Sequence, residues 1–351
     1  MAKALSERAS GIVYDDENIT VGEYLDRWLE DVVRGTVRES TFSRDEYLVR
    51  NHIKPALERR KLRKLSALDL QRLYRNRVDS GLSGSTVQKI HHVMHKALAQ
   101  AVRWDLIPRN PADSVTPPTP TLKEMRPLSV PEARRLLEAA RGDRLEAFYV
   151  LALHIGMRRG ELLGLKWADV DLDTSTIRVR RTLTRTENGK RVALGEPKTK
   201  KSRRTVRLTP VATDALGRHR ARQAEEKLKA GELYADQDLV FADEGGGLIN
   251  PSNLRQRSFA SLLRRAFGED GDATRITFHD LRHTCASLLF QRNVHPKFVQ
   301  ELLGHASVAI TLDTYSHMLP GMGGEAADAI GDALGQGFSP VGVAVGVKRP
   351  R

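Results

Sequence analysis

The sequence has a single cysteine and no long apolar segment among its 351 residues. One cysteine, Cys285, excludes an internal disulfide and fits the reducing cytoplasm. No apolar run approaches the roughly 20 residues that a membrane-spanning helix needs. The N-terminal residues MAKALSERAS lack the apolar core of a secretory signal. The sequence therefore predicts a cytoplasmic protein that has no membrane partner.

A glycine-rich phosphate loop of the Walker A type is also absent, so we do not expect ATP as a cofactor. Acidic residues are in the minority, with 44 Asp and Glu against 57 Lys and Arg, and the formal net charge is +13. A surplus of this size favours a polyanionic partner, and nucleic acid is the leading candidate.

Basic residues are clustered, which general solubility does not explain. Seven Lys and Arg lie in 50–64 and six lie in 196–207, each group beside one acidic residue. Clustered bases can displace counterions from phosphates. The side chains that we expect to contact DNA are Arg50, Lys54, Arg59, Arg60, Lys61, Arg63, Lys64, Lys89, His92, Lys96, Lys200, Lys201, Arg203 and Arg204.

The first half of the chain has a helical pattern. Residues 1–18 form a polar stub, and 19–107 read as one small domain of four helices without a strand. The second helix is expected over 39–54, where Pro55 would end it. The fourth helix has an apolar face, with Lys89, His92 and Lys96 on the opposite side.

Prolines mark residues 108–128 as an extended linker. A mixed α/β domain is expected over 129–320, beginning with a capping box at Ser129 and Glu132. Short strands are expected near 176–180, 192–194 and 205–208, with a turn at 187–189. The expected helices are 130–141, 144–155, 210–229, 251–267, 279–292, 296–303 and 307–317, and 321–351 form a C-terminal segment.

The stretch FHDLRHTCASLLF begins at Phe278 and combines two faces. Leu281, Cys285, Leu288 and Leu289 follow the spacing of one apolar stripe, which predicts a buried structural thiol. His279, Arg282 and His283 share a face turned away from that stripe.

Four other stretches carry polar residues at the ends of expected elements. In HIGMRRGELLGLKW, Gly156 should end a helix and Arg158 should follow in the turn. EPKTKKSRR reads as an exposed basic hairpin. In ELLGHASVAIT, His305 follows a helix-ending Gly304, and in TLDTYSHM, Tyr315 lies on a short helix. Each has an ordinary structural reading alone, but the order Arg, Lys, His-x-x-Arg, His, Tyr is a strong signal.

With these motifs the sequence resembles the tyrosine recombinase (phage integrase) family, specifically integrases of phages, plasmids and conjugative elements, from about Thr20 to Pro320. The resemblance implies a mainly α fold with a small β-sheet in the second domain, in which a helical core-binding domain precedes a mixed α/β catalytic domain. Carried over by motif, the catalytic residues are Arg158, Lys198, His279, Arg282, His305 and Tyr315. Glu161 matches a supporting acidic position, and Lys200 is the alternative to Lys198.

The resemblance implies a site-specific recombinase that cuts and rejoins double-stranded DNA through a 3′-phosphotyrosyl intermediate. Tyr315 would be the nucleophile, the two arginines would clamp the phosphate, and Lys198 would protonate the leaving 5′ oxygen. His279 would accept the tyrosine proton or orient the group that does, and His305 would donate to the phosphate. We expect no cofactor or metal, a homotetramer on DNA, and an accessory DNA-bending or directionality factor. The C-terminal segment would dock on a neighbouring protomer or pack in cis.

Other readings stay open at this level. The fold could serve a catalytically inactive DNA-binding regulator, or the chemistry could be that of a type IB topoisomerase. His279 and His283 have the i, i+4 spacing of a zinc pair, but the glutamate of H-E-x-x-H is absent and Arg282 would repel a cation. The arm-binding domain of many integrases is either missing or encoded before residue 1.

Overall fold

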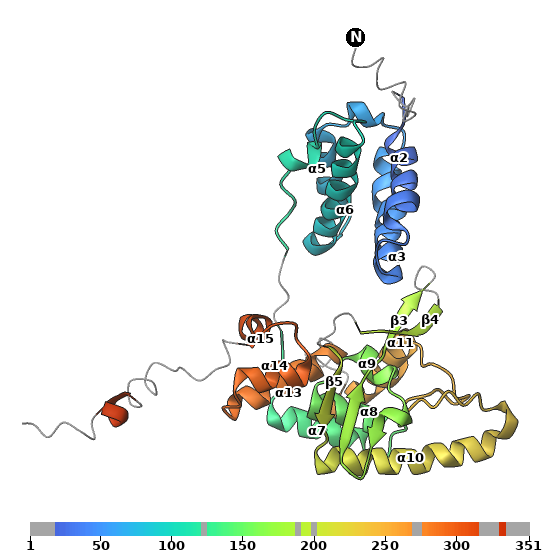
Figure 1. Ribbon diagram of the computed structural model, residues 1–351, viewed down its shortest axis with the longest axis vertical. Coiled ribbons are helices and arrows are strands. Elements are labelled where there is room, and N and C mark those ends of the chain that lie inside the picture. The colour runs from blue at the N-terminus through green and yellow to red at the C-terminus, as the bar shows by residue number, and fades with distance from the viewer. Residues whose placement is uncertain are drawn as a thin grey trace, which may run out of the picture. The chain divides into compact units, whose positions relative to one another are not determined.

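The computed structural model describes residues 18–120, 125–186, 191–197, 202–268, 276–315 and 330–334 (Figure 1). The chain divides into two compact units. The first comprises residues 1–125 together with 183–195, and the second comprises 126–182 and 196–351. Within the described ranges, no helix is both long and apolar enough to cross a membrane.

The first unit is helical except for residues 183–195, whose strands are described below. Its α-helices are α2 (Val21–Arg27), α3 (Glu39–Leu48), α4 (Lys54–Leu57), α5 (Ala67–Asp79) and α6 (Gly84–Arg103). Capping boxes at Thr20 and Ser66 start α2 and α5, because each hydroxyl accepts from the N–H of an acidic residue three positions later. The core lies between α2 and α6, where Leu25, Ile90 and Met94 are fully buried.

The prediction that Pro55 ends the second helix was wrong. A π-helical turn, Val49–Ile53, joins α3 to α4, and the helical path continues to Leu57. Pro55 lies in the first turn of α4, directly after the π-helical turn, so the type of helix changes next to the proline while the helical path continues. A second π-helical segment, Trp28–Val33, extends α2 in the same way.

The proline-rich segment is only partly a linker. Pro111–Ser114 forms a 3-10 turn, capped by the side chain of Asn110. Ala112 and Val115 are buried in the core of the first unit. The two apolar side chains bind this part of the segment to the helices, so the first unit extends beyond the predicted boundary at 107.

The second unit surrounds a buried helix, α8 (Glu146–Ile155), with other helices and a small sheet. The helices are α7 (Val130–Ala140), α9 (Arg159–Leu163), α10 (Pro210–Ala230), α11 (Pro251–Asn253), α12 (Ala260–Phe267), α13 (Phe278–Gln291), α14 (Pro296–Leu303) and α15 (Val308–Tyr315). A π-helical turn, Leu254–Phe259, joins α11 to α12. The helix α8 is apolar on nearly every side, as a helix enclosed by others must be.

The sheet of the second unit is antiparallel, with the order β1–β2–β5. Its strands are β1 (Val170–Asp171), β2 (Thr176–Val179) and β5 (Arg204–Arg207), and Ile177 pairs with Val206. The strands β3 (Thr182–Thr186) and β4 (Arg191–Gly195) form a separate two-stranded sheet. The predicted turn at 187–189 lies outside the described residues.

Two glycines end helices as predicted. Gly156 follows α8 with φ 65° and Gly304 follows α14 with φ 65°, so both are left-handed. At Gly156 an added Cβ would come within 2.6 Å of a Leu303 methyl carbon, so the position also needs the absence of a side chain. Cys285 is buried beside it, which confirms the predicted structural thiol, and burial raises its pKa to about 12.

Candidate active site

The C-terminal end of α14 gathers three arginines from distant parts of the chain. The last carbonyls of a helix have no intrahelical N–H partner and carry the negative end of the helix dipole. Here three consecutive carbonyl oxygens each accept from a different guanidinium. The pairs are Leu302 O with Arg204 Nε (2.6 Å), Leu303 O with Arg282 Nη2 (2.7 Å) and Gly304 O with Arg158 Nη2 (3.1 Å).

Each arginine reaches this point from a different element. Arg158 is the residue before α9, just beyond the left-handed Gly156. Arg282 lies early in α13 and also donates from Nη1 to the Gly156 carbonyl, at 2.7 Å. Arg204 comes from β5. The predicted pair Arg158 and Arg282 is therefore brought together, with a third guanidinium beside it.

Glu161 holds two of the arginines. Its carboxylate accepts from Arg158 Nη1 at 2.8 Å and from Arg204 Nη2 at 3.0 Å, and also from the backbone N–H of Arg158 at 3.0 Å. Burial disfavours the ionised carboxylate, but the charges of Arg204 and Arg158 outweigh it and lower the pKa of Glu161. The supporting role implied for Glu161 has a physical basis in this ion pair.

Arg204 differs from its prediction as an exposed contact to the DNA backbone. Only 8% of its side chain is exposed, and its guanidinium is occupied by Glu161 and Leu302. Alternation along β5 explains this, because Arg204, Val206 and Leu208 lie on one side while Thr205 and Arg207 face solvent. The pattern Arg-x-Val-x-Leu in the sequence contained this signal.

Tyr315 lies at the end of α15 and is 1% exposed. Burial raises the pKa of its hydroxyl to about 12, although the charge of Arg282 acts in the opposite direction. The hydroxyl is hydrogen-bonded to Nδ1 of His283 at 2.7 Å. No catalytic role was predicted for His283, although it shares a helix face with His279.

The two predicted histidines lie in the same positive environment. His279, in the first turn of α13, has its ring centroid 4.7 Å from that of His283 in an edge-on arrangement. His305 is hydrogen-bonded through Nδ1 to Thr311 at 2.8 Å. Burial, followed by nearby cationic or imidazole groups, lowers the pKa of each to about 4. Both are therefore neutral at pH 7.

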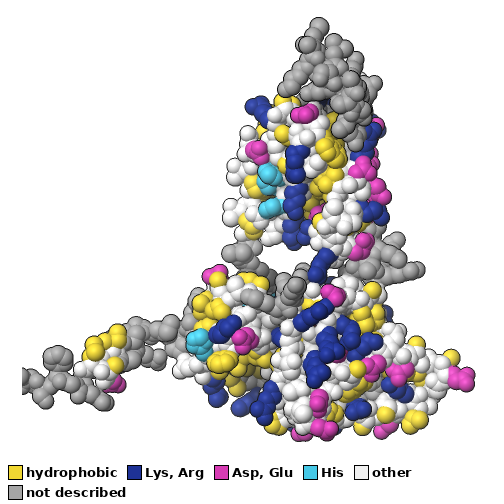
Figure 2. All heavy atoms as spheres, in the orientation of Figure 1, with side chains coloured by type: hydrophobic (Ala, Val, Ile, Leu, Met, Phe, Trp, Pro, Cys, Tyr) yellow, Lys and Arg dark blue, Asp and Glu magenta, His cyan; other side chains and the backbone are white. Residues whose placement is uncertain are grey.

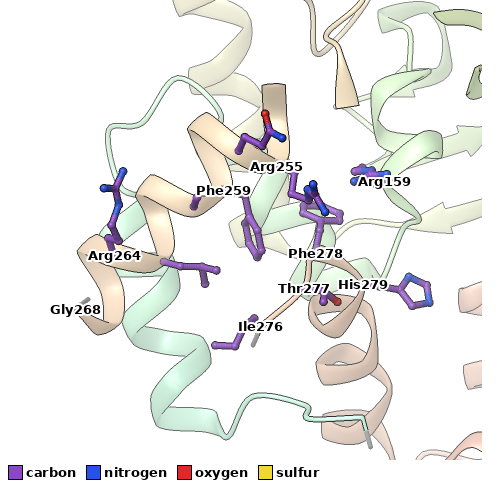
Figure 3. A pocket seen from close by; sticks show the side chains of 12 residues that line it. Arg159, Arg255, Phe259, Arg264, Gly268, Ile276, Thr277, Phe278 and His279 are labelled. Atoms are coloured by element: carbon purple, nitrogen blue, oxygen red, sulfur yellow. The ribbon is translucent and has the colours of Figure 1, made fainter. Parts of the chain in front are cut away.

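A pocket of about 970 Å³ is lined by His279 together with residues of the α11–α12 region. Figure 3 shows Arg159 and His279 toward one end, Arg264 and Gly268 toward the other, and aromatic side chains between them. Together with Arg255, these arginines make the lining of the pocket positively charged. A site of this charge is suited to an anion.

The hairpin lysines cannot be placed in this geometry, since Lys198, Lys200 and Lys201 lie outside the described residues. The neighbouring Arg203 is exposed and pairs with Glu196 at 2.5 Å. Within the described ranges, no three His, Cys, Asp or Glu side chains are grouped as metal ligands would be.

Basic side chains are also gathered on the visible faces of both units (Figure 2). In the first unit, most of the predicted contacts are exposed: Arg50, Arg59, Arg60, Lys61, Arg63, Lys64, Lys89, His92 and Lys96. Lys54 differs from the prediction, because its side chain is 19% exposed and its ammonium lies 2.7 Å from Asp26 and 3.5 Å from Glu58. The ammonium group of Lys54 is therefore occupied by ion pairs with carboxylates of the same unit.

Comparison with known proteins links both units to one family. The model described as "Phage integrase family" matches residues 127–321, and "Phage integrase, N-terminal SAM-like domain" matches residues 20–78. A XerC-like tyrosine recombinase of Caldanaerobacter subterraneus subsp. tengcongensis is 35% identical over 340 residues, 92% of this chain and 85% of that protein. The ICEBs1 integrase of Bacillus subtilis is 28% identical, over 84% of this chain and 78% of the relative.

Solved structures share the fold. The Tn1549 transposon integrase in complex with a circular intermediate DNA has a TM-score of 0.74 at 21% identity, covering 90% of this chain and 99% of that one. A lambda integrase dimer bound to a core site has a TM-score of 0.60 at 17% identity, covering 92% and 85%. The predicted fold class, mainly α with small sheets, is confirmed.

Proposed function

Because this chain belongs to the phage integrase family of tyrosine recombinases, we propose that it is a site-specific DNA recombinase acting on a mobile element, with Tyr315 as the nucleophile of a 3′-phosphotyrosyl intermediate. The observation that supports this most is the gathering of Arg158, Arg204 and Arg282 at the end of α14, four residues before the helix that carries Tyr315. Attack on a phosphodiester needs several positive charges close together, and this cluster would supply them.

The arginines stabilise the transition state. In-line attack places additional negative charge on the non-bridging phosphate oxygens, and guanidinium groups match that geometry with paired donors. Each Nη nitrogen carries two hydrogens, so Arg158 and Arg282 keep further donors after binding their carbonyls. Glu161 and α14 fix these side chains before DNA arrives, which lowers the reorganisation that the reaction requires.

The remaining groups handle protons. His305 donates to the phosphate, and Lys198 protonates the departing 5′ oxygen as general acid. His279 packs edge-on against His283 and orients it. The phosphotyrosyl bond conserves the energy of the broken linkage, so the reaction needs neither ATP nor a metal.

The basic faces hold double-stranded DNA in the cytoplasm, where four protomers assemble on two sites with an accessory DNA-bending or directionality factor. The helical unit, 19–107 with its extension to Val115, clamps one side of the duplex. The C-terminal segment, 321–351, docks on a neighbouring protomer. In support of docking, Ile330 and Leu334 are 61% and 67% exposed and would be covered by such a contact.

The test of the nucleophile is Tyr315→Phe on a suicide substrate that traps the covalent protein–DNA product. Loss of one hydroxyl should leave DNA affinity within a few-fold of wild type and abolish the covalent product. Tyr47→Phe is a matched control, because Tyr47 is exposed in the first unit and should give normal product. Covalent product at wild-type yield from Tyr315→Phe would refute the assignment.

The test of the phosphate clamp separates cleavage from binding. Arg158→Ala and Arg282→Ala should each slow single-turnover cleavage by about 10²–10³, the usual effect of one lost transition-state donor. Arg203→Ala is the control, because Arg203 is exposed and should affect mainly affinity. Equal proportional losses of binding and cleavage in the first two variants would identify them as ordinary DNA contacts.

A further inference from the structure

The hydroxyl of Tyr315 has one hydrogen-bond partner among the described residues, Nδ1 of His283 at 2.7 Å. The two residues are 32 positions apart, on α13 and α15, and their ring centroids are 5.6 Å apart. A neutral imidazole has one acceptor nitrogen, and a phenol needs an acceptor when it is buried. The tyrosine O–H therefore donates to Nδ1, and the proton of the His283 ring is on Nε2.

The surroundings of His283 keep it able to accept a proton. Burial lowers its pKa below 6.5, with Arg282 acting in the same direction and the carboxylate of Asp280 opposing it. His283 is therefore neutral at pH 7. Its Nδ1 contacts the oxygen that would attack phosphorus.

The Tyr315 hydroxyl needs a neighbouring base to take its proton if it is to act as a nucleophile at neutral pH. With a pKa of about 12, only about one Tyr315 side chain in 10⁵ is ionised at pH 7. If a base contacts the hydroxyl, Tyr315 does not have to be ionised before it attacks, because the proton can leave while the bond to phosphorus forms.

Building on the recombinase function proposed above, we propose that His283 is the general base that takes the proton of Tyr315 during DNA cleavage. The Tyr315 oxygen forms a bond to phosphorus, its proton moves to Nδ1 of His283, and the bond from phosphorus to the 5′ oxygen breaks. The leaving 5′ oxygen takes a proton from the general acid, so a phosphotyrosyl diester, a 5′ hydroxyl and an imidazolium result. In rejoining, the 5′ hydroxyl attacks phosphorus and returns its proton to the general acid. The bond from phosphorus to the Tyr315 oxygen breaks, and the imidazolium gives its proton to that oxygen.

Two variants separate proton transfer from positioning. His283→Asn places an amide oxygen close to the position of Nδ1, so it can still accept the tyrosine hydrogen bond but cannot remove the proton. His283→Ala removes the group and leaves space for added imidazole. Covalent product formation on the suicide substrate should slow by about 10²–10⁴ in both variants, the usual contribution of a general base, with DNA affinity retained.

Chemical rescue of cleavage in these variants distinguishes a base from a residue that only supports the structure, because a purely structural role of His283 would not be restored by it. Imidazole should accelerate His283→Ala, with a rate that follows the concentration of neutral imidazole. Replacing Tyr315 by a fluorinated tyrosine of lower pKa should restore most of the cleavage lost in His283→Asn. The matched control is His279→Ala, for which neither treatment should restore cleavage.

Wild-type cleavage by His283→Asn, or a loss in both His283 variants that neither imidazole nor fluorotyrosine relieves, would overturn the proposal. Either result would leave the nucleophile in place as long as Tyr315→Phe gives no covalent product. Covalent product from Tyr315→Phe would instead refute the proposed function itself.

Discussion

Replacing Glu161 by glutamine should lower the free energy of unfolding of the second unit, and the loss can be estimated from the burial and ion pairs of Glu161. The carboxylate is 3% exposed and lies between Arg158 and Arg204, at 2.8 and 3.0 Å. Removing one partner of a buried ion pair typically costs 3–5 kcal/mol, and the retained amide oxygen places this change near the lower limit, about 3 kcal/mol. For a unit of this size, that corresponds to a decrease in Tm of roughly 6–12 °C.

The assay is thermal unfolding of the full chain, with Glu301→Gln as the control. Glu301 is 57% exposed and pairs with Lys297 at 3.1 Å, so its replacement should cost less than about 1 kcal/mol. The folded-state pKa of Glu161 is lowered from 4.5, so its contribution is complete above that value and is lost as pH falls through the folded-state pKa. The Tm difference between wild type and Glu161→Gln should therefore narrow below about pH 4.5. Equal Tm values for the two glutamine variants, or a difference that persists in acid, would refute this account.

Gly156→Ala should destabilise the protein by more than about 1 kcal/mol, because the residue has φ 65° and a Cβ would meet a leucine carbon at 2.6 Å. Gly217→Ala, in the interior of α10 with no heavy atom within 4 Å, should instead raise Tm; the reverse order of Tm values would contradict the reasoning. Lys198→Ala should cripple cleavage of normal DNA but be rescued when sulfur replaces the scissile 5′ oxygen, whereas Lys200→Ala should show mainly a salt-sensitive binding defect. If the rescue is seen for Lys200→Ala alone, the general acid is Lys200. Cleavage should persist in EDTA at constant ionic strength, and loss that magnesium or zinc restores would disprove metal independence.

Local signals in the sequence were sufficient for the helix ends around the site. Capping chemistry placed the start of α7 at Ser129, and glycine placed the ends of α8 and α14. These ends matter because the arginines bind at them. The two-residue strand β1 was not predicted, since two residues are too few to show alternation.

Contacts between distant residues required the folded chain. The hydrogen bond between His283 and Tyr315 joins two helices that no periodicity relates. Similarly, the sequence order of Arg158, Arg204 and Arg282 gives no indication that all three bind one helix end. The burial of Arg204 was in principle readable from alternation, but a run of bases in which Lys and Arg dominate favoured an exposed reading.

The helix α14 also links the three arginines of the proposed active site to one another. Three successive carbonyls of one rigid rod anchor three guanidiniums, and the four residues 304–307 connect that rod directly to the helix of Tyr315. A translation or rotation of α14 would displace all three anchor points together, and the short connection would transmit the motion to Tyr315, the proposed nucleophile. The position of α14 therefore sets the positions of all three guanidiniums relative to the helix that carries the proposed nucleophile.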